Sequence, residues 1–353
     1  MVYLTGEGAI RGLWTSKVER KMPPDIISGH RQVSIETTKP AQLPTDHFPG
    51  QPNTSKSQST PARPPGTFFL TPFTGPDKSA NLSRARSKVL EASRSGASLI
   101  VLPECFNSPY GTQYFSSYAE TLLPSPPTPT QSPTFHALSS LARESSAYII
   151  GGSIPEYSTT TKKHHNTSLT FAPTGDLLAT HRKVHLFDID IPGKIRFHES
   201  EVLSPGHKVT VVDLPDYGKI GIAICYDIRF PELAMIAARK GCFLLVYPGA
   251  FNLTTGALHW SLQARARAMD NQVYVALCSP ARDMTASYNA WGHSMAVDPN
   301  AQVMAEAAEG EEIVYAELDG AKLDESRKGI PIYSQRRFDV YPDVSEGKVR
   351  DDE

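Results

Sequence analysis

Cysteine is scarce in this sequence, and long apolar runs are missing from it. Its 353 residues include four cysteines, too few and too scattered for a disulfide framework. These are Cys105, Cys225, Cys242 and Cys278. No segment approaches the roughly 20 consecutive apolar residues that cross a bilayer, and the N-terminus lacks the apolar stretch of a secretory signal. We therefore expect a soluble intracellular protein with no membrane partner, in which any one of the cysteines can be a reactive thiol.

An excess of charge of either sign is also lacking. The chain carries 35 basic and 37 acidic residues, for a formal net charge of -2. Sequence-independent binding to phosphate backbones needs a basic surface, so we expect no nucleic-acid partner. Hydrophobic residues make up 40% of the chain and charged residues 20%, which is typical of a globular protein with a large buried core.

Residues 1–66 show no helical or strand periodicity. They hold nine of the 29 prolines, and residues 52–60 form a polar run, so we predict disorder here. Four basic residues also fit a mitochondrial presequence, but three acidic residues depart from the acid-poor pattern of such segments. The basic residues are Arg11, Lys17, Arg20 and Lys21, and the acidic ones are Glu7, Glu19 and Asp25. We expect a cytoplasmic location, with the mitochondrion as the alternative.

From about residue 77 onward, helical and strand patterns alternate. Apolar residues recur at helical spacing from Leu82 to Ala92, and the apolar run 99–102 follows as a buried strand. The turn sequence at 173–175 predicts a hairpin. Further strands are predicted at 219–224, 243–247, 272–278 and 294–298, and further helices at 135–143, 232–240 and 258–270. This interleaving predicts an α/β fold, with one domain over residues 67–344 and a polar tail over 345–353.

Three polar residues follow predicted strands, where a sheet holds side chains rigidly: Glu104, Lys183 and Cys225. Cys225 stands at a strand-to-helix turn, which we expect to expose the sulfur to free backbone N–H groups. A helix N-terminus and a nearby cation favour the thiolate, which is the attacking form. The alternative is a buried structural cysteine.

Glu104 follows a strongly apolar strand, where partial desolvation would raise its pKa towards the range useful for a base. The alternative is a solvated cap at the strand end. Lys183 alternates with apolar neighbours, so we expect its ammonium to point into the same enclosed space, the alternative being an exposed edge charge. His181 and His185 lie four apart in a strand-to-loop segment, a spacing that does not bring two imidazoles onto one metal, so we expect no metal site.

These residues and their neighbours resemble the nitrilase, or carbon–nitrogen hydrolase, superfamily over about residues 77–343. The family's glutamate, lysine and cysteine match Glu104 in Leu-Pro-Glu-Cys-Phe, Lys183 in Arg-Lys-Val-His-Leu-Phe and Cys225 in Ile-Cys-Tyr-Asp-Ile-Arg-Phe-Pro-Glu. A second family glutamate, which helps position the lysine and the substrate, matches Glu199. The resemblance implies a four-layer α-β-β-α sandwich over the domain at 67–344, a homodimer, and no metal or organic cofactor.

Finer segments resemble one branch, the omega-amidases, which hydrolyse the side-chain amide of 2-oxoglutaramate and 2-oxosuccinamate. The matching segments are 104–111, 186–194, 249–256 and 287–294. The resemblance implies that Phe251 and Thr255 flank the substrate. An anionic 2-oxo acid monoamide also needs a fixed cation, for which Arg229 is the best candidate, because guanidinium binds a carboxylate bidentately. The alternative for Arg229 is a structural salt bridge with Asp227 or Glu232.

The expected mechanism uses the cysteine as nucleophile. Glu104 takes the thiol proton, the Cys225 sulfur attacks the amide carbon, and Lys183 with the Tyr226 backbone N–H holds the oxyanion. Ammonia leaves, and a water activated by Glu104 hydrolyses the thioester. The alternatives are a deaminated-glutathione amidase, another carbon–nitrogen hydrolase of the superfamily, or a catalytically silent scaffold.

One departure from the family lies at its first core strand. Residues 66–73 stand where the family has an apolar strand, and Pro72 removes a backbone donor from the ladder. We expect a shortened strand whose loss is compensated elsewhere, unless this stretch does not belong to the functional protein.

Overall fold

The computed structural model describes residues 66–70, 72, 74–193 and 195–341. The predicted disorder over 1–66 and the predicted polar tail over 345–353 lie outside these residues, Gly66 excepted. Within the described part, no helix is both long enough and apolar enough to span a membrane.

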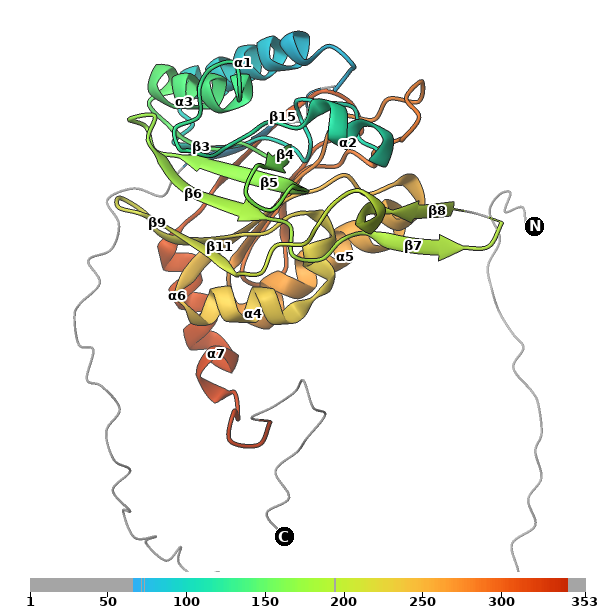
Figure 1. Ribbon diagram of the computed structural model, residues 1–353. Coiled ribbons are helices and arrows are strands. Elements are labelled where there is room, and N and C mark those ends of the chain that lie inside the picture. The colour runs from blue at the N-terminus through green and yellow to red at the C-terminus, as the bar shows by residue number, and fades with distance from the viewer. Residues whose placement is uncertain (1–65, 71, 73, 194, 342–353) are drawn as a thin grey trace, which may run out of the picture. The chain divides into compact units, whose positions relative to one another are not determined.

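The first sheet has strand order β15-β1-β2-β3-β5-β4, with β6 paired to β5. Strands β1, β2 and β3 run parallel, and β15 and the β4–β6 strands are antiparallel to their neighbours. Its strands are β1 (Gly66–Leu70), β2 (Leu99–Val101), β3 (Tyr148–Ile150), β4 (Ile154–Ser158), β5 (Lys163–Phe171), β6 (Leu177–Arg182) and β15 (Ile313–Glu317). Helices α1 (Lys78–Arg94) and α3 (Pro133–Ser145) cover its outer face (Figure 1).

The second sheet has strand order β14-β13-β12-β11-β10-β9. Its strands are β9 (Thr210–Leu214), β10 (Gly218–Ile222), β11 (Cys242–Pro248), β12 (Tyr274–Cys278), β13 (Met295–Val297) and β14 (Val303–Glu306). The middle strands β10, β11 and β12 are parallel, since helices α4 (Pro231–Arg239) and α5 (Leu253–Asn271) connect them across the outer face.

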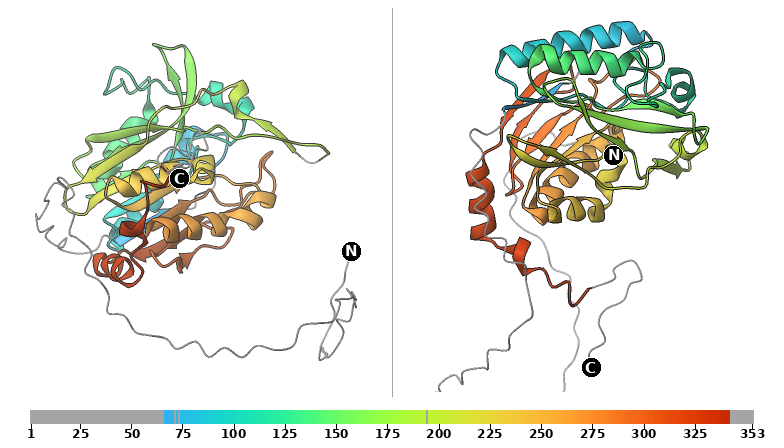
Figure 2. Two further views of the ribbon diagram at one scale, coloured as in Figure 1. Left: turned by 90° about the horizontal axis from the view of Figure 1, so that it is seen from below. Right: turned by 60° about the vertical axis from the view of Figure 1, so that its left-hand side comes forward.

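Three apolar clusters separate these layers, and the two sheets face each other across the middle one. Strand β2 shows how the sequence builds this: Leu99 and Val101 point between the sheets, whereas Ile100 points towards α1 and α3. The third cluster lies between the second sheet and α4 and α5. The two sheets with helices on both outer faces make the expected α-β-β-α sandwich (Figure 2).

The remaining elements lie outside the sandwich layers. The short hairpin of β7 (Asp188–Ile191) and β8 (Ile195–His198) forms a two-stranded sheet of its own. Helix α2 (Thr112–Tyr118) follows the loop after β2, and helices α6 (Gly320–Gly329) and α7 (Ile332–Gln335) follow β15.

Most predicted elements are present, and their ends differ for identifiable reasons. The helix predicted over 258–270 begins earlier, at Leu253, because the Asn252 side chain caps it by accepting the Thr255 N–H. The strand predicted over 219–224 ends at Ile222. Strand β1 pairs with both β2 and β15 and ends before Pro72, so the proline lies beyond the ladder rather than in it. The strand expected to be shortened is therefore present at five residues.

Candidate active site

Four segments converge at one end of the sandwich and carry the candidate residues. Glu104 follows β2, Lys183 follows β6, Glu199 follows β8, and Cys225 follows β10. Strands β2 and β10 belong to different sheets, so the site is assembled across the interface between the sheets. Catalytic groups commonly occupy such strand ends, because the strands hold the loops that follow them rigidly.

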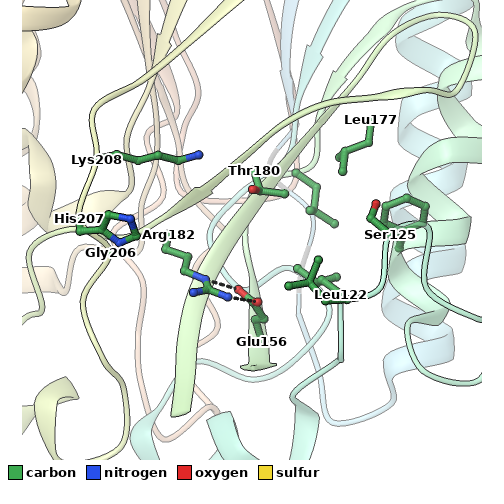
Figure 3. Close-up of a pocket in the computed structure, with 12 residues that line it drawn as sticks. Leu122, Ser125, Glu156, Leu177, Thr180, Arg182, Gly206, His207 and Lys208 are labelled. Carbon is green, nitrogen blue, oxygen red and sulfur yellow. Dashed lines mark hydrogen bonds and ion pairs between the residues drawn. The ribbon is translucent and has the colours of Figure 1, made fainter. Parts of the chain in front are cut away.

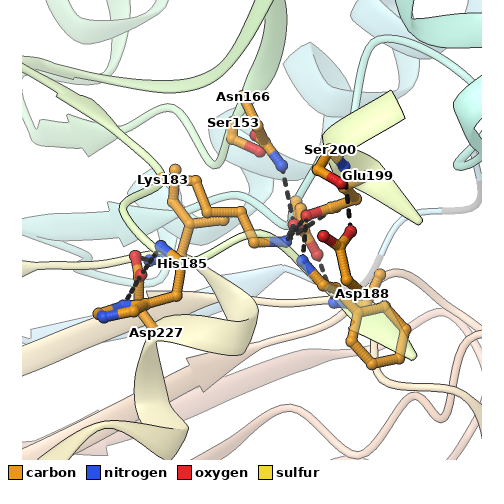
Figure 4. A network of polar contacts seen from close by, with 12 residues as sticks. Ser153, Asn166, Lys183, His185, Asp188, Glu199, Ser200 and Asp227 are labelled. Atoms are coloured by element: carbon orange, nitrogen blue, oxygen red, sulfur yellow. Dashed lines mark hydrogen bonds and ion pairs between the residues drawn. The ribbon is translucent and has the colours of Figure 1, made fainter. Parts of the chain in front are cut away.

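Lys183 lies at the centre of this cluster (Figure 4). Its Nζ is 3.1 Å from Oε1 of Glu104 and 2.9 Å from the Glu199 carboxylate, and all three side chains are fully buried. Burial alone would lower the pKa of Lys183, but the two carboxylates outweigh it and raise that pKa well above its usual value. Lys183 is thus a cation that is held in place and shielded from solvent, and the alternative of an exposed edge charge is wrong.

Glu104 is a desolvated carboxylate with four polar neighbours. Its Oε1 accepts from Asn166 Nδ2 at 2.9 Å as well as from Lys183, and its Oε2 accepts from the Ala250 N–H at 2.8 Å. Burial is the main cause that raises the pKa of Glu104, and the charge of Glu199 adds to it. Lys183 and a hydrogen bond with the Cys225 thiol oppose the rise. The solvated-cap alternative for Glu104 is wrong, because the side chain has no exposed surface.

Glu199 holds the other side of Lys183. Its carboxylate accepts the Tyr110 hydroxyl at 2.8 Å and the Phe187 backbone N–H at 2.8 Å, in addition to the ammonium. Three donors from two segments, the loop after β2 and the stretch after β6, therefore fix its position.

The surroundings of Cys225 differ from the predicted exposure of its sulfur. The turn after β10 is strained, since Cys225 has φ 48°, but the side chain is only 4% exposed. Burial and the negative charge of Glu104 raise the pKa of Cys225 well above its usual value, although Lys183 and the Ala250 N–H act in the opposite direction. The expectation of an exposed thiol poised as thiolate is wrong for this state. The group is a buried thiol that needs a base.

Arg229 lies four residues beyond Cys225, at the end of the 3₁₀ helix η2 (Cys225–Arg229). Its guanidinium carbon lies 5.4 Å from the centre of the Tyr226 ring and 4.9 Å from that of the Phe251 ring. Its Nη1 donates to Nδ1 of His259 at 3.2 Å, and its buried Nε has no hydrogen-bond partner in the structure. The salt-bridge alternative fails, since no ion pair joins Arg229 to Asp227 or Glu232 among the described residues.

The other three predicted substrate contacts are Thr255, Phe251 and the backbone N–H of Tyr226. The Thr255 hydroxyl donates to Asn252 Oδ1 at 3.0 Å within the cap of α5, so its proton is already used. Phe251 stacks edge-on against Trp260, with ring centres 5.1 Å apart. The backbone N–H of Tyr226 lies in the first turn of η2, where no intrahelical acceptor is available.

Sequence reasoning missed Asp227, which joins the lysine segment to the cysteine turn. Its carboxylate accepts from the backbone N–H groups of His185 and Ile224, at 2.8 and 2.9 Å. The rings of His185 and His181 contact it at 2.9 and 3.3 Å. The two histidines considered as metal ligands thus act as partners of one buried carboxylate. In the described part of the chain, no group of three histidine, cysteine or acidic side chains is arranged to hold a metal ion.

Cys105 directly follows Glu104 and lies outside the strands. It lies in a turn at φ 50° and packs with Tyr110, Phe115 and Ala250. Burial raises the pKa of the Cys105 thiol, and the charge of Glu104 raises it further.

Comparisons with known proteins show the family and the fold of this chain. The carbon-nitrogen hydrolase family model matches residues 69–328. This chain belongs to the carbon–nitrogen hydrolase family. Omega-amidase NIT3 of Saccharomyces cerevisiae is 54% identical over 272 residues, covering 76% of this chain and 92% of that protein. Omega-amidase NIT2 of Bos taurus is 58% identical over 264 residues, covering 75% and 92%.

A solved structure places the chain within the superfamily. The crystal structure of Saccharomyces cerevisiae Nit3, a member of branch 10 of the nitrilase superfamily, superimposes with a TM-score of 0.72 at 49% identity. The match covers 78% of this chain and 97% of that one. The fold and the family are thus those that the motifs implied, and the chain is a hydrolase of carbon–nitrogen bonds.

We predict that Asp227→Asn destabilises this hydrolase in a pH-dependent way. Burial opposes ionisation of Asp227, but hydrogen bonds from His181 and His185 outweigh it and hold its pKa well below the usual value. A lowered pKa contributes stability above the unfolded-state value near 3.8 and loses it as the pH falls. Urea unfolding at pH 7 should show a loss of ~1–3 kcal/mol, which shrinks towards pH 3.

The matched control is Asp213→Asn, which changes an exposed carboxylate on β9 and should leave stability within about 0.5 kcal/mol. A loss at pH 7 no larger than that of the control would show that Asp227 does not hold the two segments together.

Proposed function

We propose that the protein is an omega-amidase that cleaves the side-chain amide of 2-oxoglutaramate or 2-oxosuccinamate through a cysteine thioester. The observation that carries the proposal is the contact of a buried thiol, Cys225, with a carboxylate whose pKa is raised, Glu104, beside the fixed cation Lys183. The identity of 54–58% to proteins named omega-amidase supports the same branch.

In the proposed first half-reaction, Glu104 removes the thiol proton while the Cys225 sulfur attacks the amide carbon. The carbonyl oxygen gains the electron pair of the opened C=O bond, and Lys183 with the Tyr226 N–H stabilises this oxyanion. The pair returns, the C–N bond breaks, and the nitrogen takes the proton from Glu104 to leave as ammonia. The acyl group is then a thioester on Cys225.

In the second half-reaction, Glu104 takes a proton from water, and the resulting hydroxide attacks the thioester carbon. The C–S bond breaks, and the sulfur recovers a proton from Glu104. The products are the 2-oxo dicarboxylate and the free thiol. Glu199 fixes Lys183 throughout, because it accepts a second hydrogen bond from the ammonium, at 2.9 Å, beside the one to Glu104. Glu104 carries the protons between sulfur, nitrogen and water, and the new carboxylic acid loses its proton to the solvent.

The first test compares two substrates with the purified protein. Ammonia release should be faster from 2-oxoglutaramate than from deaminated glutathione, and Cys225→Ala should abolish both while far-UV circular dichroism stays unchanged. The change removes only the sulfur, so folding should survive. Faster turnover of deaminated glutathione would favour that amidase instead. Substantial activity in Cys225→Ala would remove the cysteine from the role of nucleophile.

The proposed substrate carboxylate binds Arg229. Its guanidinium is held between the rings of Tyr226 and Phe251 and keeps an unpartnered Nε, so donors remain for an anion. Phe251 and Thr255 then lie next to the bound substrate, the first by packing and the second through an oxygen lone pair, since its proton serves the cap.

Arg229→Lys should raise KM for 2-oxoglutaramate by about tenfold or more, because lysine keeps the charge but loses bidentate donation. KM for a neutral aliphatic amide should stay within about twofold. The measurement is steady-state ammonia release at several concentrations of each substrate. A similar increase for both substrates would place Arg229 outside the carboxylate subsite.

The proposed assembly is a homodimer formed through α4 and α5. Large apolar side chains on these helices are exposed, and those on α5 recur at a spacing that puts them on one face. They are Ile236 (41% exposed), Leu258 (62%), Leu262 (62%) and Met269 (54%). Pairing this face with a second copy would stack the two sandwiches.

The cytoplasm remains the proposed compartment, where reduced cysteines persist, since all four cysteines are free.

Leu262→Glu should convert the dimer to a monomer, because it buries a charge at the centre of the proposed interface. Light scattering coupled to size-exclusion chromatography gives the mass directly. Leu178→Glu is the control, since Leu178 is exposed on β6, away from both helices. A monomeric parent protein, or a variant that stays dimeric, would reject this interface.

A further inference from the structure

A cavity of about 200 Å³ lies beside β6, and we call it the β6 cavity (Figure 3). Strands β5 and β6, helix α3, the loop after Glu120 and the segment before β9 form its walls. Its apolar side is made by Leu122, Leu123, Phe135, Leu169 and Leu177. Leu123 remains 49% exposed and Leu177 is half-buried, whereas Leu122, Phe135 and Leu169 are buried, so Leu123 and Leu177 form the part of the apolar wall that is open to a ligand.

The β6 cavity is separate from the active site. Arg182 lines it, whereas the next residue, Lys183, contacts Glu104 and Glu199. The hydrogen-bond ladder between β5 and β6 continues through Lys183, whose N–H donates to the Asn166 carbonyl. The side chains of Arg182 and Lys183 therefore point to opposite faces of the sheet. A ligand in the cavity would also touch the segment that holds the lysine, since the N–H of Gly206 in its wall donates to the Lys183 carbonyl at 2.7 Å.

The polar side of the cavity has one unbalanced positive charge. Arg182 is paired with Glu156, to which its Nε donates at 2.9 Å, and the Thr167 hydroxyl also donates to Glu156. The Lys208 ammonium has no ion pair or hydrogen bond with any described residue, and it extends over the cavity towards Thr180 (Figure 3). Two cations against one carboxylate leave a charge suited to a monoanion.

The volume limits the size of the apolar part of the ligand. An apolar cavity of roughly 150 Å³ accommodates a benzene ring, so 200 Å³ takes a ring of that size with a short polar arm. We propose that the β6 cavity binds a monocarboxylate with an apolar body of about the size of a phenyl ring. Its body packs against Leu123 and Leu177, and its carboxylate contacts Lys208 beside Arg182.

The test uses 3-phenylpropionate and its neutral analogue 3-phenyl-1-propanol, titrated into the full chain by calorimetry. The acid should bind saturably at one site per chain, and the alcohol should bind about tenfold more weakly or not at all, because it lacks the charge that Lys208 meets. Lys208→Ala should weaken binding of the acid by the same factor. Leu177→Trp should abolish it by filling the cavity.

Two control variants distinguish this cavity from other cationic positions. Lys219→Ala removes an exposed lysine on β10, and Arg229→Lys alters the proposed substrate subsite, so both should bind 3-phenylpropionate as the parent protein does. The proposal is overturned by three results: no saturable binding, equal binding by Lys208→Ala, or a loss in Arg229→Lys that matches the loss in Lys208→Ala. If the melting curve shows that Leu177→Trp does not fold, the binding of 3-phenylpropionate by the surface variant Lys208→Ala still tests the proposal.

Discussion

The ammonium of Lys183, buried between the carboxylates of Glu104 and Glu199, is the interaction on which the site depends. A lone ammonium in this dry interior would lose its proton, and two carboxylates without it would repel each other. The three groups together carry one net negative charge. That charge adds to the effect of burial and raises the pKa of neighbouring acids, among them the Tyr110 hydroxyl and the Cys225 thiol.

The sandwich keeps these groups together because each comes from a strand end that the core fixes. Two sheets pack through one apolar cluster, and Glu104 and Cys225 follow strands from opposite sheets. Asp227 adds hydrogen bonds between the two sheets, since its carboxylate accepts from the backbone N–H of His185, which follows β6, and of Ile224, which follows β10. The position of Lys183 relative to Cys225 therefore rests on hydrogen bonds as well as on packing.

The sequence predicted the layers and the residues of this site, but not the state of those residues. Periodicity locates the strands, and three motifs name Glu104, Lys183 and Cys225, because both signals are local. The burial of Cys225 depends on Ala250 and Phe251, which come from a loop some 25 positions away, so the turn alone suggested an exposed thiol. The partners of Asp227 and the contact of Arg229 with His259 are likewise long-range, and no spacing in the chain signals them.

A buried thiol with a raised pKa suits a nucleophile whose base is already in contact with it. In the proposed first step, the Cys225 proton moves to Glu104 and a negative charge moves from the carboxylate to the sulfur, so the net charge of the site does not change. No solvent has to reorganise around a new ion in the dry interior. In the proposed attack, the charge then passes from the sulfur to the oxygen of the substrate, next to the ammonium of Lys183. In this proposed scheme the same cation lies near the charge before and after the attack, and the contacts with both carboxylates hold it in place.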